Sequence, residues 1–103
     1  MKVIEHEPQF WFLLQDANSL MLDVSCEHGA VGYDVLIELN ADESAHYENN
    51  GRDFLTQLAE AINFSAPGGR GSFSPYKARN IQQQRGEEVL AAIRAWRGAG
   101  ARE

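Results

Sequence analysis

The chain has 103 residues, of which 44% are hydrophobic and 23% charged, a composition typical of one globular domain with an apolar core. A net charge of −6 and a pI near 5.0 exclude a general binder of nucleic acid or of anionic membranes. The charge is unevenly distributed along the chain. Residues 1–51 carry ten acids and one base, a balance of −9, whereas residues 52–103 carry five acids and eight bases, a balance of +3.

The first 39 residues are typical of an antiparallel meander. Three segments have the apolar content or the period-two alternation of strands, namely 9–15, 20–26 and 31–39. Turn-forming residues separate them at 16–19 and at 27–29. Val3 and Ile4 add a short edge strand before Pro8.

Three helices are predicted after residue 39. Asn40, with an acid three residues later at Glu43, predicts a capped short helix over 41–48. Asn50 and Asp53 are expected to cap a second helix. Its apolar face consists of Phe54, Leu55, Leu58, Ala59 and Ile62.

The last helix is predicted to begin near Gly86, with Glu87 and Glu88 in its first turn. Its apolar stripe consists of Val89, Leu90, Ile93 and Trp96. A long loop over 63–85 precedes it, in which Ser74 is expected to cap a short turn, and residues 98–103 are expected to fray.

Together these elements predict an α+β fold: an antiparallel three- to four-stranded meander packed on two main helices, in two layers. The chain is expected to be a single domain over 1–103, with the meander in 1–39 and a helical half in 40–97. Both main helices are expected to cover the same sheet face, that of Leu22, Val24, Tyr33, Val35 and Ile37. Alternation then places Asp23, Ser25, Asp34, Glu38, Met21 and Leu36 on the opposite face.

Signals for catalysis or metal binding are weak. Cys26 and His28 stand two apart but lack further partners, and the acids near Asp34 to Glu48 have no calcium-loop spacing. The glycine-rich stretch 67–72 follows a helix and lacks the lysine of a phosphate-binding loop. We therefore predict no catalytic residue, no metal and no cofactor. One cysteine and an N-terminus without a long apolar run favour the cytoplasm.

Four segments of the chain carry a family resemblance: 12–14, the strand ending at Cys26, 32–34 leading into 36–40, and 47–67 with Leu58-Ala59 and Ile62 to Pro67. On these segments the chain as a whole resembles small bacterial immunity-type proteins, which are encoded beside secreted polymorphic or contact-dependent toxins. The resemblance implies a protein that neutralises its cognate toxin in the producing cell. It implies no particular binding residues.

The leading hypothesis is accordingly a non-enzymatic inhibitor that binds a cognate protein, a toxin with a basic active site, and neither nucleic acid nor a membrane. The binding surface is predicted to combine the acids Asp23, Asp34, Glu38, Asp42 and Glu43 with the apolar Met21 and Leu36. The competing interpretation of the same residues is an ordinary solvated sheet face.

Two other functions stay open at this point. One is a small enzyme or ligand-binding domain, in which the 63–85 loop closes over a pocket lined by His28, His46, Tyr76 or Arg79. The other is a structural homodimer formed through the exposed sheet face or an edge strand, which the acids on that face disfavour.

Overall fold

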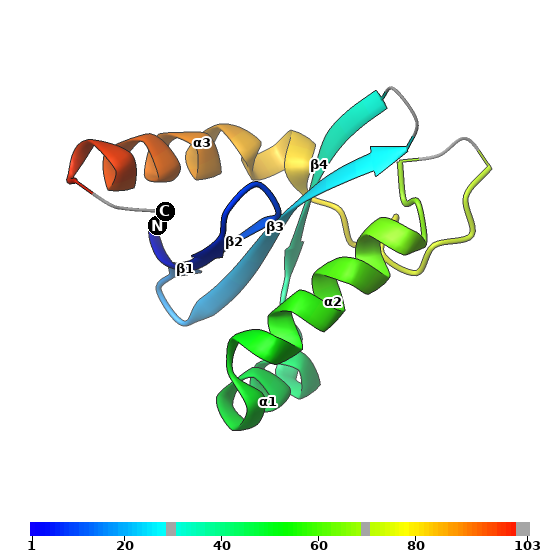
Figure 1. Ribbon diagram of the computed structural model, residues 1–103, viewed down its shortest axis with the longest axis horizontal. Coiled ribbons are helices and arrows are strands. Elements are labelled where there is room, and N and C mark those ends of the chain that lie inside the picture. The colour runs from blue at the N-terminus through cyan, green and yellow to red at the C-terminus, as the bar shows by residue number, and fades with distance from the viewer. Residues whose placement is uncertain (29–30, 69–70, 101–103) are drawn as a thin grey trace.

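The computed structural model describes residues 1–28, 31–68 and 71–100; the side chains of His28 and Val31 are not described. Within these ranges the chain forms four strands and three helices (Figure 1). They are β1 (Lys2–Glu7), β2 (Trp11–Asp16), β3 (Ser19–His28), β4 (Val31–Glu38), α1 (Ala41–Asn50), α2 (Arg52–Phe64) and α3 (Gln82–Gly98). None of the helices in the described ranges is long and apolar enough to cross a membrane.

The four strands form one antiparallel sheet in the order β1-β2-β3-β4, which confirms the predicted meander. β1 is longer than the predicted strand at Val3 and Ile4, and its register with β2 shifts between Val3 and Glu5. In the centre of the sheet, β3 pairs Leu22 with Ile37 of β4 and with Leu13 of β2.

α1 and α2 follow the sheet and meet at Gly51. Asn40 and Glu43 form the predicted capping box, in which each side chain accepts a hydrogen bond of 2.9 Å from the other residue's backbone N–H. Asn50 does not cap α2 as predicted. It ends α1, and Gly51 stands between the helices at φ 64°, a conformation that a residue without Cβ adopts at little cost.

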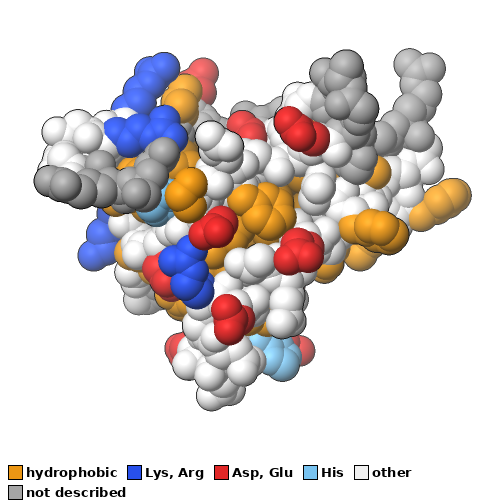
Figure 2. All heavy atoms as spheres, in the orientation of Figure 1, with side chains coloured by type: hydrophobic (Ala, Val, Ile, Leu, Met, Phe, Trp, Pro, Cys, Tyr) orange, Lys and Arg blue, Asp and Glu red, His pale blue; other side chains and the backbone are white. Residues whose placement is uncertain are grey.

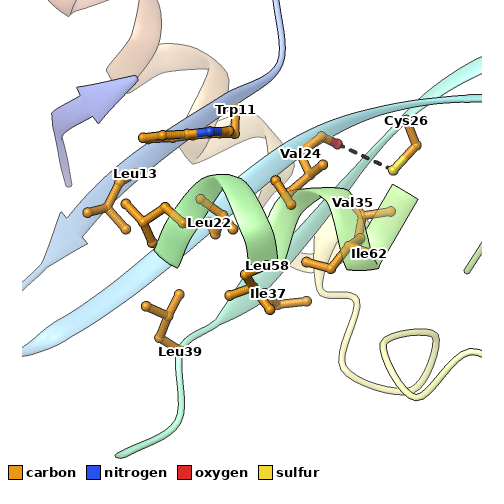
Figure 3. Close-up of a cluster of buried hydrophobic side chains, with 12 residues drawn as sticks. Trp11, Leu13, Leu22, Val24, Cys26, Val35, Ile37, Leu39, Leu58 and Ile62 are labelled. Atoms are coloured by element: carbon orange, nitrogen blue, oxygen red, sulfur yellow. Dashed lines mark hydrogen bonds between the residues drawn. The ribbon is translucent and has the colours of Figure 1, made fainter. Parts of the chain in front are cut away.

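α2 and the sheet enclose the larger core and form the two-layer α+β unit that the sequence predicts (Figure 3). The sheet contributes the alternate apolar residues expected to face inward, and α2 contributes Leu55, Leu58, Ala59 and Ile62. Trp11 is buried here as well, and its indole N–H donates to the Thr56 hydroxyl over 3.2 Å.

α3 departs from the prediction, because it lies across the opposite face of the sheet (Figure 1). Its Val89 and Ile93 pack there with Leu14, Met21 and Leu36. The physical reason is that neighbouring residues on three strands are apolar, so both faces of the sheet carry apolar surface that folding removes from water. These neighbours are Leu13 and Leu14, Met21 and Leu22, and Leu36 and Ile37.

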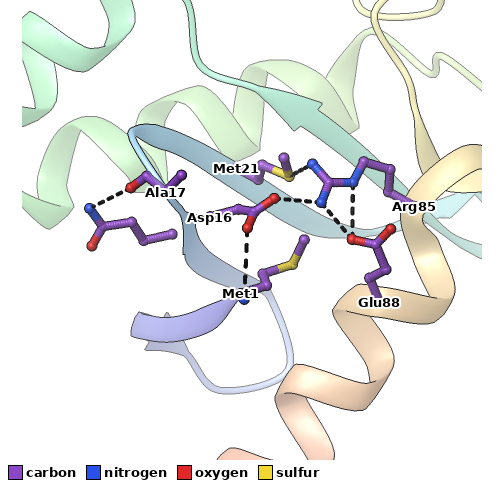
Figure 4. A network of polar contacts seen from close by, with 7 residues as sticks. Met1, Asp16, Ala17, Met21, Arg85 and Glu88 are labelled. Carbon is purple, nitrogen blue, oxygen red and sulfur yellow. Dashed lines mark hydrogen bonds and ion pairs between the residues drawn. The ribbon is translucent and has the colours of Figure 1, made fainter.

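Polar contacts fix the N-terminal half of α3 over the β2–β3 hairpin (Figure 4). Arg85 donates to the carboxylates of Asp16 and Glu88, in each case over 2.5 Å. α3 also begins earlier than predicted, at Gln82 rather than near Gly86. Ile81 is the N-cap of this helix, and the Asn80 side chain just before it accepts from the Gln82 N–H over 3.0 Å, which gives one of the first N–H groups a partner.

Candidate functional site

A hollow of about 410 Å³ lies between α3 and the sheet face that α3 crosses. Phe12 of β2, Asp23 and Ser25 of β3, and Asp34 of β4 form its floor. α3 forms its wall, from Gln82 to Arg97. The hollow exists because the apolar contacts of α3 are with Leu14, Met21 and Leu36, so the polar residues next to them on the strands stay open on one side.

Asp23 is the most unusual residue of the hollow. Pairing with Phe12 on one side and Leu36 on the other places it in the interior of the sheet, where it is half-buried. Its Oδ1 is inaccessible and has no hydrogen-bond partner among the described residues. Burial, followed by the negative charge of Asp34, raises its pKa to about 7. At neutral pH this carboxyl group is therefore poised between its neutral and its ionised form.

Two other residues that line the hollow, Asp34 and Gln82, also carry acceptor oxygens. Asp34 is exposed on the neighbouring strand and accepts a hydrogen bond of 3.4 Å from the Ser25 hydroxyl. Gln82, at the start of α3, has an inaccessible Oε1 that finds no partner within the described chain. The exposed carboxylate of Asp34 is the accessible acceptor here, and it suits an incoming group with N–H donors and a positive charge, such as a guanidinium or an ammonium.

The charges around the hollow are mixed but mainly negative. Asp23, Asp34 and Glu87 line it, against one base, Arg97. The Arg97 guanidinium lies over the Phe12 ring, 5.7 Å from its centroid. Phe12 thereby supplies the apolar part of the floor.

Met21 and Leu36 cannot serve as the apolar contacts that the sequence predicts. They do lie on the face of Asp23 and Asp34, but they are 1% and 0% exposed, because α3 packs over them. A role as partner contacts would require that no helix covers this face of the sheet.

The other three predicted acids lie apart from the hollow. Glu38 is exposed further along β4, beyond Leu36, and Asp42 is exposed in the first turn of α1. Glu43 is engaged by Arg79, whose guanidinium donates to both carboxylate oxygens over 2.6 and 2.8 Å. Figure 2 accordingly shows acidic side chains scattered over the visible face rather than gathered in one patch. Of the predicted set, the structure brings Asp23 and Asp34 together.

The residues of the alternative pocket occupy different surroundings, as far as the structure describes them. His46 stacks on Phe54, Tyr76 packs against the core under α2, and Arg79 binds Glu43. The side chain of His28 lies outside the described residues. Cys26 is buried, and burial raises its thiol pKa to about 11. Among the described residues, no three His, Cys, Asp or Glu side chains are grouped as metal ligands.

The sequence prediction missed the wall of the hollow. The sequence places Gln82 in the loop, and the signal for an earlier helix start is Asn80, a residue type common at helix starts, two residues before it. Comparison with known protein families, curated proteins and solved structures gave no match. The residues of the hollow therefore have to carry any functional assignment.

Proposed function

We propose that this protein is a non-enzymatic binding module that receives a basic side chain of a cognate protein in the hollow at Asp23 and Asp34. The observation that carries the proposal is the buried, unpartnered Oδ1 of Asp23 beside a second carboxylate. A buried acceptor without a donor costs about 1–3 kcal/mol, and more when it is charged. A guanidinium or ammonium group of a partner, placed in the open part of the hollow beside this carboxyl group, supplies the compensating charge.

The partner class follows from the resemblance to immunity-type proteins. We propose that the chain acts in the bacterial cytoplasm as an inhibitor of a cognate toxin with a basic active site. The net charge of −6 and the acids in residues 1–51 support this role, because they attract a basic surface before contact is made. Glu38 and Asp42, which lie outside the hollow, serve such steering rather than the final contact.

The test is complex formation with the protein encoded by the adjacent gene, measured by titration calorimetry. Asp34→Lys reverses a charge on an exposed residue in the hollow and is expected to weaken binding by about a hundredfold. Asp42→Lys is the matched control, since it makes the same charge change on an exposed acid elsewhere. It is expected to weaken binding by less than about tenfold, mainly through the association rate. Equal effects of the two variants, or no binding by any neighbouring protein, contradict the proposal.

Sedimentation of the purified chain alone separates this role from the homodimer. A self-associating chain whose dimer persists in Asp34→Lys would favour the structural alternative over an inhibitor.

A further inference from the structure

The outer edge of β4 is paired along only part of its length. At its C-terminal end the segment before α3 lies along it. The Leu36 N–H donates to Asn80 Oδ1 over 3.1 Å, and the Leu36 carbonyl accepts from the Ile81 N–H over 2.8 Å. Arg79 adds a bond of 2.8 Å to the carbonyl of Glu38. Residues 79–81 therefore cover this end of the β4 edge, through one main-chain hydrogen bond and two hydrogen bonds from side chains.

The pairing pattern shows where this cover ends. In an antiparallel ladder, alternate residues point both main-chain groups away from their partner strand. Leu36 is such a residue. Asp34 and Gly32 lie two and four positions before it on β4, so they also direct their N–H and C=O groups outward. In the described part of the chain these groups have no partner, and both residues are exposed. α3 begins at Gln82, so the chain leaves the edge before it reaches Asp34.

We propose that this open edge binds an extended segment of the cognate protein as an added strand, with a basic side chain of that segment against Asp34 and Asp23. The basic character of the bound segment rests on the proposed function, whereas the strand pairing rests on the unpaired edge of β4. Adjacent strands lie about 4.8 Å apart, and alternate side chains of the added strand share the sheet face of Asp34. A long basic side chain on that face lies beside Asp34 and reaches across β4 toward the hollow.

The same geometry argues against a second copy of this chain as the occupant. Two β4 edges paired about a two-fold axis at Asp34 would bring the Asp34 carboxylates of the two copies close together. Like charges on directly opposed residues destabilise strand pairing. A segment that alternates basic and apolar residues has the complementary charge and the period of a strand.

Gly32 offers a matched pair of variants for the test. Gly32→Pro removes an outward N–H without breaking a bond to β3. Gly32→Ala keeps this N–H, and its Cβ would meet the Cys26 carbonyl at 3.7 Å, an ordinary contact. The probe is a capped hexapeptide of alternating arginine and valine, titrated into the ¹⁵N-labelled full chain. We expect Gly32→Pro to bind the peptide at least about tenfold more weakly than Gly32→Ala.

Amide hydrogen exchange of the unsubstituted protein keeps the test valid if Gly32→Pro fails to fold. The Gly32 and Asp34 amides should exchange fast in the free protein and at least about tenfold more slowly with bound peptide. Protection of both amides before the peptide is added, or unchanged exchange after it binds, overturns the inference.

Binding of the cognate protein to the same variants separates the inference from the proposed function. If Gly32→Pro binds it as tightly as Gly32→Ala while Asp34→Lys loses binding, the added strand is wrong and the proposed function stands. If Gly32→Pro loses binding while Asp34→Lys keeps it, strand addition is supported and the acidic hollow is not the recognition site.

Discussion

Arg79, in the segment that leads into α3, holds both carboxylate oxygens of Glu43 in α1. The same guanidinium donates to the carbonyl of Glu38 at the end of β4. Because Glu43 also completes the capping box with Asn40, this contact joins the start of α1, the last residue of β4 and the approach to α3. The hydrogen bonds from Arg79 lower the pKa of Glu43, although burial opposes them.

Arg79→Ala is expected to lower the free energy of unfolding by about 1–2 kcal/mol, because a partly buried, two-pronged ion pair is lost. Arg52→Ala is the control. Arg52 donates to Glu7 over 2.6 Å and to the His6 carbonyl over 2.9 Å, but the Arg52 and Glu7 side chains are 48% and 46% exposed, so solvent screens the ion pair and the expected loss is below about 1 kcal/mol. Urea denaturation at pH 7 measures both. A loss no greater for Arg79→Ala than for Arg52→Ala would show that the contact does not join these elements.

The raised pKa of Asp23 predicts that stability falls as pH increases from about 4 to about 7. In this range the folded protein holds a proton on Asp23 that the unfolded chain, with a pKa near 3.8, has released. The ionised group costs the folded state about 4 kcal/mol above pH 7. Asp23→Asn should remove this dependence and stabilise the protein most at pH 8. Asp34→Asn should shift the fall to lower pH, because it removes one cause of the raised pKa. A stability profile of Asp23→Asn parallel to that of the parent would refute the assignment.

The sheet and α2 are predictable because their signals are local. Alternation at Leu22 and Val24 selects one sheet face, and the capping box of Asn40 and Glu43 lies within four consecutive residues. The side of the sheet on which α3 lies depends on contacts far apart in sequence, such as that of Ile81 with Leu36. The apolar doublets on the strands do indicate cover on both faces, but they do not specify which element supplies it.

The candidate site was predictable only in part. The strand period alone places Asp23 and Asp34 on one face. The unpartnered oxygens of Asp23 and Gln82 depend on where α3 crosses that face, which no local pattern specifies. Burial of Leu36 under α3 has the same origin, and for that reason a residue predicted as a surface contact is part of a core.

The position of α3 can be tested with two leucines whose predicted and observed roles are reversed. Leu36→Ala is expected to cost about 2–5 kcal/mol, because the fully buried side chain leaves a cavity between β4 and α3. Leu90→Ala, in the predicted apolar stripe of α3, should cost less than about 1 kcal/mol, because Leu90 is 47% exposed. Thermal or urea unfolding compares the two. A larger loss for Leu90→Ala would mean that α3 presents a different side to the sheet.

Formation of the proposed complex is expected to release protons from Asp23. At pH 7 the carboxyl of Asp23, with a pKa of about 7, is about half protonated in the free protein. A guanidinium or ammonium group placed against it favours the ionised form, so binding should release about half a proton at this pH, and affinity should rise between pH 6 and pH 8. Titration calorimetry with the cognate protein in phosphate and in Tris, whose ionisation enthalpies differ, measures the released proton. Asp23→Asn should bind without this buffer dependence, whereas Asp42→Asn should retain it. Equal binding enthalpies in the two buffers for the unsubstituted chain would mean that the partner does not place a cation at Asp23.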